Sequence, residues 1–244
     1  MKLACASGAF HRAIECGDLT QLEFVDLCAR EFACDGVVLD VRHFPRSDDD
    51  YLAQVKKMTT DRGISIAALV DSAFFSAARE AMAKVLRAAT LLGAPLVAAP
   101  LASETERSWS EQLAALNEAT SLAKAANVTL ALRNAPGTFA AGAQDCKRVT
   151  KEADSAWLRL GPDPERLSAE SDPGVLAPNA VLLWACAGSL REPSISGTLD
   201  AFAGFRGHLA LDERNGDATV AAMREATRVW RIALSQRELH STAR

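Results

Sequence analysis

The 244-residue sequence lacks the marks of a nucleic-acid-binding or membrane protein. Its formal net charge is −4 and it has no run of lysine and arginine, so it offers no basic surface to a polyanion. No stretch approaches the roughly 20 apolar residues that span a bilayer, and residues 1–10 contain no long apolar segment. We therefore expect a cytoplasmic protein that binds neither nucleic acid nor membrane.

Several catalytic motifs are absent as well. The sequence contains no G-x-S-x-G, G-x-x-x-x-G-K-[ST], G-x-G-x-x-G or H-E-x-x-H motif. Its six cysteines include no C-x-x-C pair, so a zinc site is not indicated, and we expect most of the thiols to be reduced and packed. The α/β-hydrolase, P-loop, dinucleotide-binding and zinc-protease classes are therefore not predicted.

What is present is an alternation of short apolar runs with helical stretches. Hydrophobic residues make up 49% of the chain and charged residues 24%, which is enough apolar material for a large core. The alternation predicts an α/β protein with one domain over residues 1–244, a parallel (β/α)₈ TIM barrel. The predicted strands are 3–5, 37–41, 64–69, 96–99, 128–133, 157–160, 181–185 and 208–211.

Local signals predict where some helices begin and end. The S/T-x-x-E spacing at Thr20 and at Ser108 is that of a capping box, which starts a helix. Gly93 is expected to end the third helix, and Asp217 to cap the start of the last one. The prolines of residues 163–200 leave room there only for short or irregular helices.

Alternation along the strands points three charged side chains into the barrel. If Leu130 and Leu132 pack outward against helices, Arg133 at the end of that strand faces inward, and the same parity turns Asp163 and Asp212 inward. Isolated buried charges are costly, so these groups must pair with one another or bind something. A structural ion-pair cluster without a ligand and a ligand site both remain open.

Polar side chains that follow the strands are the candidate site, because active sites of such barrels form at the carboxyl ends of the strands. Arg12, Asp71 and Glu104 are interpreted as solvated loop residues, and His208, within a strand, as a satisfied interior residue. The full set is His11, Arg12, Asp40, Arg42, His43, Asp71, Glu104, Arg133, Asn134, Asp163, Asp212 and Glu213.

The first seventy residues resemble a known family. Ala-Phe-His-Arg-Ala-Ile at 9–14 is followed by Gly-Asp-Leu at 17–19 and Leu-Cys-Ala at 27–29, and Asp-Gly-Val-Val-Leu at 35–39 leads to His-Phe-Pro at 43–45. These segments resemble the opening of the xylose isomerase-like barrels. That family includes sugar phosphate isomerases and epimerases and is distantly related to endonuclease IV. The resemblance implies a TIM barrel that acts on small sugars.

The resemblance also implies a divalent metal, from which this sequence departs. Family members typically hold the ion with Glu, Asp, His and Glu at the ends of strands five to eight, and a Glu is common after strand two. The matching positions here are Arg133 in Arg-Asn-Ala, Asp163, Ala185 or Cys186, Asp212 with Glu213 as the alternative, and Val38. One carboxylate has become a cation, and the imidazole is missing.

An ion left with at most two protein ligands is not tightly held, so we predict no stoichiometric metal. We hypothesise that the Arg133 guanidinium takes the place of the metal and pairs with Asp163 and Asp212, since its fork of donors suits carboxylates. A weak divalent site at these two aspartates is the alternative.

Two functions are compatible with these residues. The first is an isomerase or epimerase for a small sugar or sugar-like acid, with Asp163, Asp212 and His11 as catalytic residues. In it, ligand contacts are expected from Arg133, Asn134, His43, Arg42 and Glu213. The second is a barrel that binds a carbohydrate-like ligand or another protein without catalysis. A phosphodiesterase would need a multi-metal cluster and a basic face, and the sequence offers neither. The number of subunits is left open.

Overall fold

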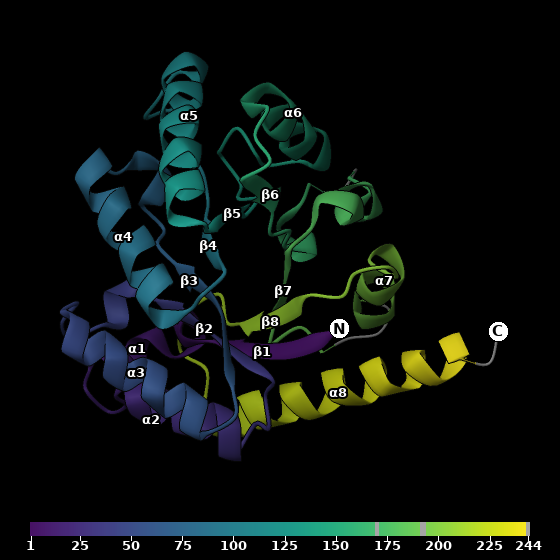
Figure 1. The fold of residues 1–244 in the computed structure, drawn as a ribbon. Helices are drawn as coiled ribbons and strands as arrows, with labels where there is room; N and C mark the ends of the chain where they lie inside the picture. The colour runs from purple at the N-terminus through teal and green to yellow at the C-terminus, as the bar shows by residue number, and fades with distance from the viewer. Residues whose placement is uncertain (169–170, 191–193, 243–244) are drawn as a thin grey trace.

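The computed structural model describes residues 1–168, 171–190 and 194–242, and within them the chain folds as a parallel barrel (Figure 1). The eight strands found there lie in the order β6-β5-β4-β3-β2-β1-β8-β7. The ends of the sheet meet where Leu160 forms a parallel bridge with Ala180 and the Trp184 N–H donates to the Pro162 carbonyl over 3.0 Å. The strands are β1 (Lys2–Ala6), β2 (Gly36–Asp40), β3 (Ser65–Val70), β4 (Leu96–Ala99), β5 (Thr129–Leu132), β6 (Leu158–Leu160), β7 (Leu182–Cys186) and β8 (His208–Asp212).

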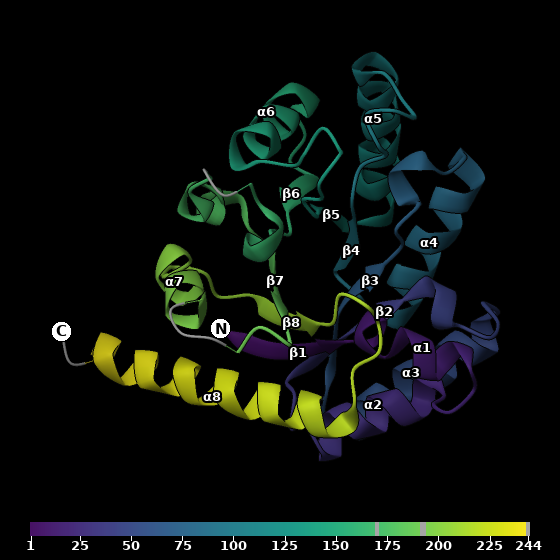
Figure 2. The same cartoon turned by 180° about the vertical axis from the view of Figure 1, so that it is seen from behind.

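Helices cover the outside of the sheet, and α8 runs along β1 and β8 and past α7 in both views (Figure 2). No helix in the described ranges is both long and apolar enough to cross a membrane. The α-helices are α1 (His11–Glu15), α2 (Gln21–Arg30), α3 (Asp49–Asp61), α4 (Arg79–Leu92), α5 (Trp109–Ala126), α6 (Ala143–Ala153), α7 (Ser194–Ala201) and α8 (Val220–Thr242). The 3₁₀ helices are η1 (Ser7–Phe10), η2 (Val41–His43), η3 (Phe74–Ser76), η4 (Pro164–Arg166) and η5 (Pro173–Asn179).

The predicted helix signals are confirmed except at the last helix. Complete capping boxes start α2 at Thr20 and α5 at Ser108, and Gly93 ends α4 in the left-handed conformation. The prediction that Asp217 caps the last helix is wrong. The helix begins at Val220, where the Thr219 hydroxyl accepts the N–H of Ala222 over 3.1 Å.

All eight predicted strands exist, with ends that shift by no more than one residue. The predicted second strand, 37–41, ends one residue early, because the Asp40 carboxylate accepts the Arg42 N–H over 2.9 Å and turns the chain into η2. Within 163–200 the described residues form η4, η5 and the short α7 between strands, as predicted. Residues 169–170 and 191–193 of that segment lie outside the described residues.

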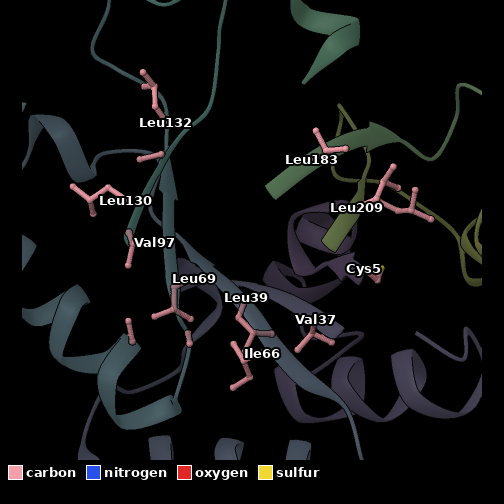
Figure 3. Packing of buried hydrophobic residues seen from close by; sticks show 14 of the residues in the cluster. Cys5, Val37, Leu39, Ile66, Leu69, Val97, Leu130, Leu132, Leu183 and Leu209 are labelled. Carbon is pink, nitrogen blue, oxygen red and sulfur yellow. The ribbon is translucent and has the colours of Figure 1, made fainter. Parts of the chain in front are cut away.

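The core has two layers that follow the predicted strand parity. Leu130 and Leu132 pack in the outer layer between sheet and helices (Figure 3). Ala131 lies in the inner layer. The buried inner layer consists mostly of small side chains, with one tryptophan among them: Ala4, Ala6, Val38, Ala67, Ala68, Ala98, Ala131, Leu182, Trp184 and Ala210. Alanine side chains alone are too small to fill the interior of such a barrel, so the Trp184 ring occupies most of that space.

Removal of this ring should therefore be costly. We expect Trp184→Ala to lower the free energy of unfolding by about 3–5 kcal/mol, because a large cavity would open inside the barrel. Urea denaturation followed by circular dichroism measures the loss. The control is Trp157→Ala, whose ring is only half-buried. Equal losses in the two variants would contradict the filling role of Trp184.

Candidate functional site

A cavity of about 260 Å³ opens at the carboxyl ends of the strands. Its floor contains the Trp184 ring and small side chains of the barrel interior, and its wall includes four arginines, Arg42, Arg133, Arg166 and Arg214. The predicted site residues that line it are His11, Asp40, Arg42, Arg133, Asn134, Asp212 and Glu213. The cavity is close to the lower end of the roughly 300–1,000 Å³ usual for small-molecule sites, so it suits a small ligand.

The Arg133 guanidinium bridges two aspartates beside this cavity. One terminal nitrogen donates to Asp212 Oδ2 and the other to Asp163 Oδ2, each over 2.9 Å. The guanidinium carbon lies 3.9 Å from the centre of the Trp184 ring, in cation–π contact. Burial alone would lower the pKa of Arg133, but the charges and hydrogen bonds of Asp212 and Asp163 outweigh burial and raise it. The group therefore stays charged, and the pairing predicted from the sequence is present.

Asp163 is held deep in the wall, with 4% of its surface exposed. Its backbone N–H donates to Asn134 Oδ1 over 2.7 Å, and Asn134 Nδ2 donates to its carbonyl over 3.0 Å. Its carboxylate also lies 3.2 Å from Nε of Arg166. Asn134 thus ties the end of β6 to the end of β5, and Asp163 faces a smaller cavity behind Arg133.

Asp212 stands at the end of β8 and reaches the main cavity. Its Oδ2 takes the Arg133 bond, and its Oδ1 accepts the Glu213 N–H over 3.0 Å. Gly8 approaches closely, because a Cβ there would lie 3.2 Å from Asp212 Oδ1. The Cys186 thiol donates to Glu213 over 3.7 Å, and burial, ahead of the carboxylate charge, raises its pKa.

Two histidines, at the start of α1 and the end of η2, form a second group. His11 Nδ1 lies 2.9 Å from His43 Nε2, and His43 Nδ1 lies 2.9 Å from Ser7 Oγ, which accepts the Asp40 N–H over 2.9 Å. His43 is 5% exposed and stands behind His11 rather than among the residues that line the cavity. Burial lowers its pKa, so it favours the neutral form.

The remaining candidate residues differ in how well their positions agree with the sequence interpretation. Arg12 and Glu104 are exposed, as expected of solvated residues. Asp71 differs, because it is half-buried and burial raises the pKa of its carboxyl group. His208 is half-buried at the start of β8, with its Nε2 3.3 Å from Ser65 Oγ.

Sequence reasoning did not identify Ser7, Trp184, Arg166 or Arg214 as site residues. Strand parity could have found Trp184, because Leu183 beside it packs outward. The other three lie just after strands or in turns, where no periodicity signals their direction.

The residues present do not fit a divalent metal. A metal between Asp163 and Asp212 would meet the Arg133 guanidinium, which already occupies the space between the two carboxylates. Ala185 and Cys186 at the end of β7 offer no imidazole. Nowhere in the described ranges do three or more His, Cys, Asp or Glu side chains gather as a metal site. The donor set is that of a guanidinium held by two carboxylates.

Comparisons with known proteins give a consistent picture of the chain. A family model described as xylose isomerase-like TIM barrel matches residues 27–191, so the likeness extends well beyond the first seventy residues. The sequence matches none of the curated proteins to which it was compared.

Solved structures match over nearly the whole chain. A D-psicose 3-epimerase from Clostridium cellulolyticum H10, solved with D-tagatose, superposes with a TM-score of 0.77 at 14% identity, over 98% of this chain and 99% of that one. A D-tagatose 3-epimerase-like protein gives 0.79 at 11% identity, over 99% and 100%. The probable 3-DHS dehydratase AsbF from Bacillus anthracis gives 0.73 at 14% identity, over 94% and 98%. At these identities the likeness shows the fold.

Loss of the Arg133 charge should leave Asp163 and Asp212 without the cation that they share. We expect Arg133→Met to lower the free energy of unfolding by about 3–5 kcal/mol, because one cation would no longer compensate Asp163 and Asp212. The triple variant with Asp163→Asn and Asp212→Asn should recover most of this loss. Urea denaturation of the three proteins measures both effects, and a triple variant no more stable than Arg133→Met would contradict the charge argument.

His43 should make the protein sensitive to acid. Because burial holds its pKa below the usual 6.5, the unfolded chain binds a proton that the folded chain rejects. The free energy of unfolding should therefore fall as the pH drops below 6.5, and fall less in His43→Gln. Urea denaturation at pH 7 and pH 5 compares the two slopes. Identical slopes would show that His43 takes up its proton as readily in the folded state.

Proposed function

Because the chain belongs to the xylose isomerase-like TIM barrel family, we propose that it is a sugar isomerase or epimerase that works without a divalent metal. Its substrate is a small sugar or a sugar-like acid, bound in the cavity at the carboxyl ends of the strands. The observation that carries this proposal is the Arg133 guanidinium, which stands with its two aspartates where the family's metal ligands are expected.

Unused donors on Arg133 favour a ligand at this place. A guanidinium has more N–H groups than the bonds to Asp163 and Asp212 use, and Nε of Arg133 is buried with no partner. Nε itself is out of a ligand's reach, but Arg133 lines the cavity, and the N–H groups left on its terminal nitrogens can donate to a carbonyl, hydroxyl or carboxylate oxygen of a ligand. Arg42, Arg166 and Arg214 also line the cavity, and although each is paired with a carboxylate, their remaining N–H groups can donate to the oxygens of a ligand.

The reaction requires that a proton leave the carbon beside a carbonyl, and the oxygen of that carbonyl then gains negative charge. A fixed guanidinium can stabilise such an oxyanion with its free N–H groups. Asp212 and His11 line the cavity and are the proposed proton-transfer residues. Asp163 lies behind Arg133, so its proposed role is to position the guanidinium. Asn134 supports it through its bonds to Asp163, and Arg42 and Glu213 are the proposed ligand contacts.

One observation favours a second function, binding without catalysis. Oδ2 of both Asp163 and Asp212 already accepts a hydrogen bond from Arg133, so fewer carboxylate oxygens are left to take a proton from a ligand. If no other group accepts the proton, the barrel would hold a sugar acid without converting it.

Deuterium exchange separates these functions. The protein is incubated in deuterated water with D-fructose, D-psicose, D-tagatose and matching sugar acids, with and without EDTA, and the sugars are analysed by mass spectrometry. We expect incorporation at the carbon next to the carbonyl, unchanged by EDTA. Arg133→Met should slow it by about 100-fold or more, since removal of one oxyanion donor costs about that much. Arg159→Met, which removes a guanidinium bonded to Asn179 outside the cavity, is the control.

Three results would redirect the proposal. A sugar acid that raises the melting temperature without exchanging deuterium would favour the binding function. Activity that EDTA abolishes and Mn²⁺ restores would show that a metal displaces Arg133. No effect of any sugar on exchange or melting temperature would overturn both functions.

A further inference from the structure

Ser7, His43 and His11 form a chain of hydrogen bonds that ends at the cavity, and the two interior members lie outside its lining. Ser7 and His43 are 0% and 5% exposed, and the side chain of His11 is 27% exposed. The two imidazole rings stand 5.2 Å apart between centres. Nothing in the charge cluster at Arg133 accounts for this buried arrangement.

The donors and acceptors present restrict how this series of hydrogen bonds can be protonated. His11 Nε2 lies 3.2 Å from Glu15 Oε1, and a carboxylate oxygen only accepts, so this nitrogen carries a hydrogen. In the neutral chain His11 Nδ1 then accepts from His43 Nε2, and His43 Nδ1 accepts from the Ser7 hydroxyl. When His11 is protonated, its Nδ1 donates to His43 Nε2, and His43 Nδ1 donates to Ser7 Oγ.

Every ring nitrogen has a partner in both patterns, which differ by one proton and by the direction of the two bonds that His43 makes. Ser7 permits the reversal because a hydroxyl can donate or accept, while its oxygen keeps the Asp40 N–H in either case. His43 stays neutral in both patterns and only exchanges the nitrogen that carries its hydrogen. A buried carboxylate in the place of Ser7 would not permit this.

We propose that Ser7 and His43 are positioning residues that prepare His11 to transfer protons with the ligand through Nε2. The inference rests on the proposed function, because it places the ligand in the same cavity. Glu15, whose side chain is 65% exposed, accepts the hydrogen of His11 Nε2 in the free protein. When a ligand binds, a ligand hydroxyl takes the place of Glu15 at Nε2. A ligand hydroxyl, unlike a carboxylate, can donate to that nitrogen.

The transfer step balances. With its Nδ1 hydrogen donated to His43, neutral His11 has a lone pair at Nε2, which takes the proton from the ligand while the bonding electrons remain on the ligand. The resulting imidazolium returns the proton from Nε2 in the reverse step. No charge enters the buried part of the chain. The charged groups that face the pair are Glu15 from α1, Asp40 from β2 and Arg42 from η2.

Nuclear magnetic resonance tests this chain without any ligand. In protein labelled with ¹⁵N-histidine, long-range ¹H–¹⁵N spectra from pH 5 to pH 9 report which nitrogen of each ring carries hydrogen. We expect His11 to take up a proton as the pH falls. At the same midpoint the His43 hydrogen should move from Nε2 to Nδ1 while His43 stays neutral. A His43 that keeps its tautomer through the titration of His11 would overturn the proposal.

Two variants sharpen the test. In His43→Phe we expect His11 to lose its fixed tautomer and show the mixed signals of free histidine, whereas His208→Phe, a half-buried histidine remote from the pair, should leave His11 unchanged. Circular dichroism checks that both variants fold. A His11 spectrum that is unchanged in His43→Phe would show that His43 does not position it.

A sugar that raises the melting temperature is then added to the labelled wild-type protein. A shift of the His11 Nε2 signal supports the proposal, and binding without such a shift overturns the role of Nε2. If no sugar binds, the proposed function fails, while the His43 tautomer still decides whether the hydrogen-bond chain exists. The two failures are therefore distinguishable.

Discussion

The site depends on the balance of one buried cation against two carboxylates. Arg133, Asp163 and Asp212 come from the ends of three strands, and their charges compensate one another in the barrel wall. This requirement fixes the positions of the ends of β5, β6 and β8 relative to one another. It also fixes which donors of Arg133 are left for a ligand, since two of its nitrogens are already directed at carboxylates. The Trp184 ring covers one face of the guanidinium, which stacks on it.

Two different kinds of polar group therefore lie at the cavity. The charges of Arg133, Asp163 and Asp212 compensate one another, and the guanidinium can stabilise an anion. The hydrogens of His11 and His43 can be rearranged along a series of hydrogen bonds without moving charge into its buried part. The barrel fold alone does not determine this division, because solved structures of the same fold include epimerases and a probable dehydratase. It comes from the residues at the strand ends.

The strands and the Arg133 cluster could be predicted because alternation along a strand is a strict rule of period two. Once Leu130 and Leu132 are placed outward, the direction of Arg133 follows. The turns obey no such rule. The cap of α8 lies at Thr219 instead of Asp217, and the directions of Arg166 and Arg214 depend on the three-dimensional course of loops that the sequence does not fix locally. His43 was identified as polar and close to the site, but only its burial shows that it stands behind His11.

The small side chains under the cavity have a consequence for how such a protein can change. Alanines such as Ala98 and Ala131 surround the Trp184 ring, and that ring supports Arg133 from below. A methyl group added at one of them would press on the indole and lift the guanidinium toward the opening. The depth of the binding space can thus be adjusted from underneath. Selection for shorter or longer ligands could act on a position such as Ala131, which does not line the cavity, and leave the polar contacts in place.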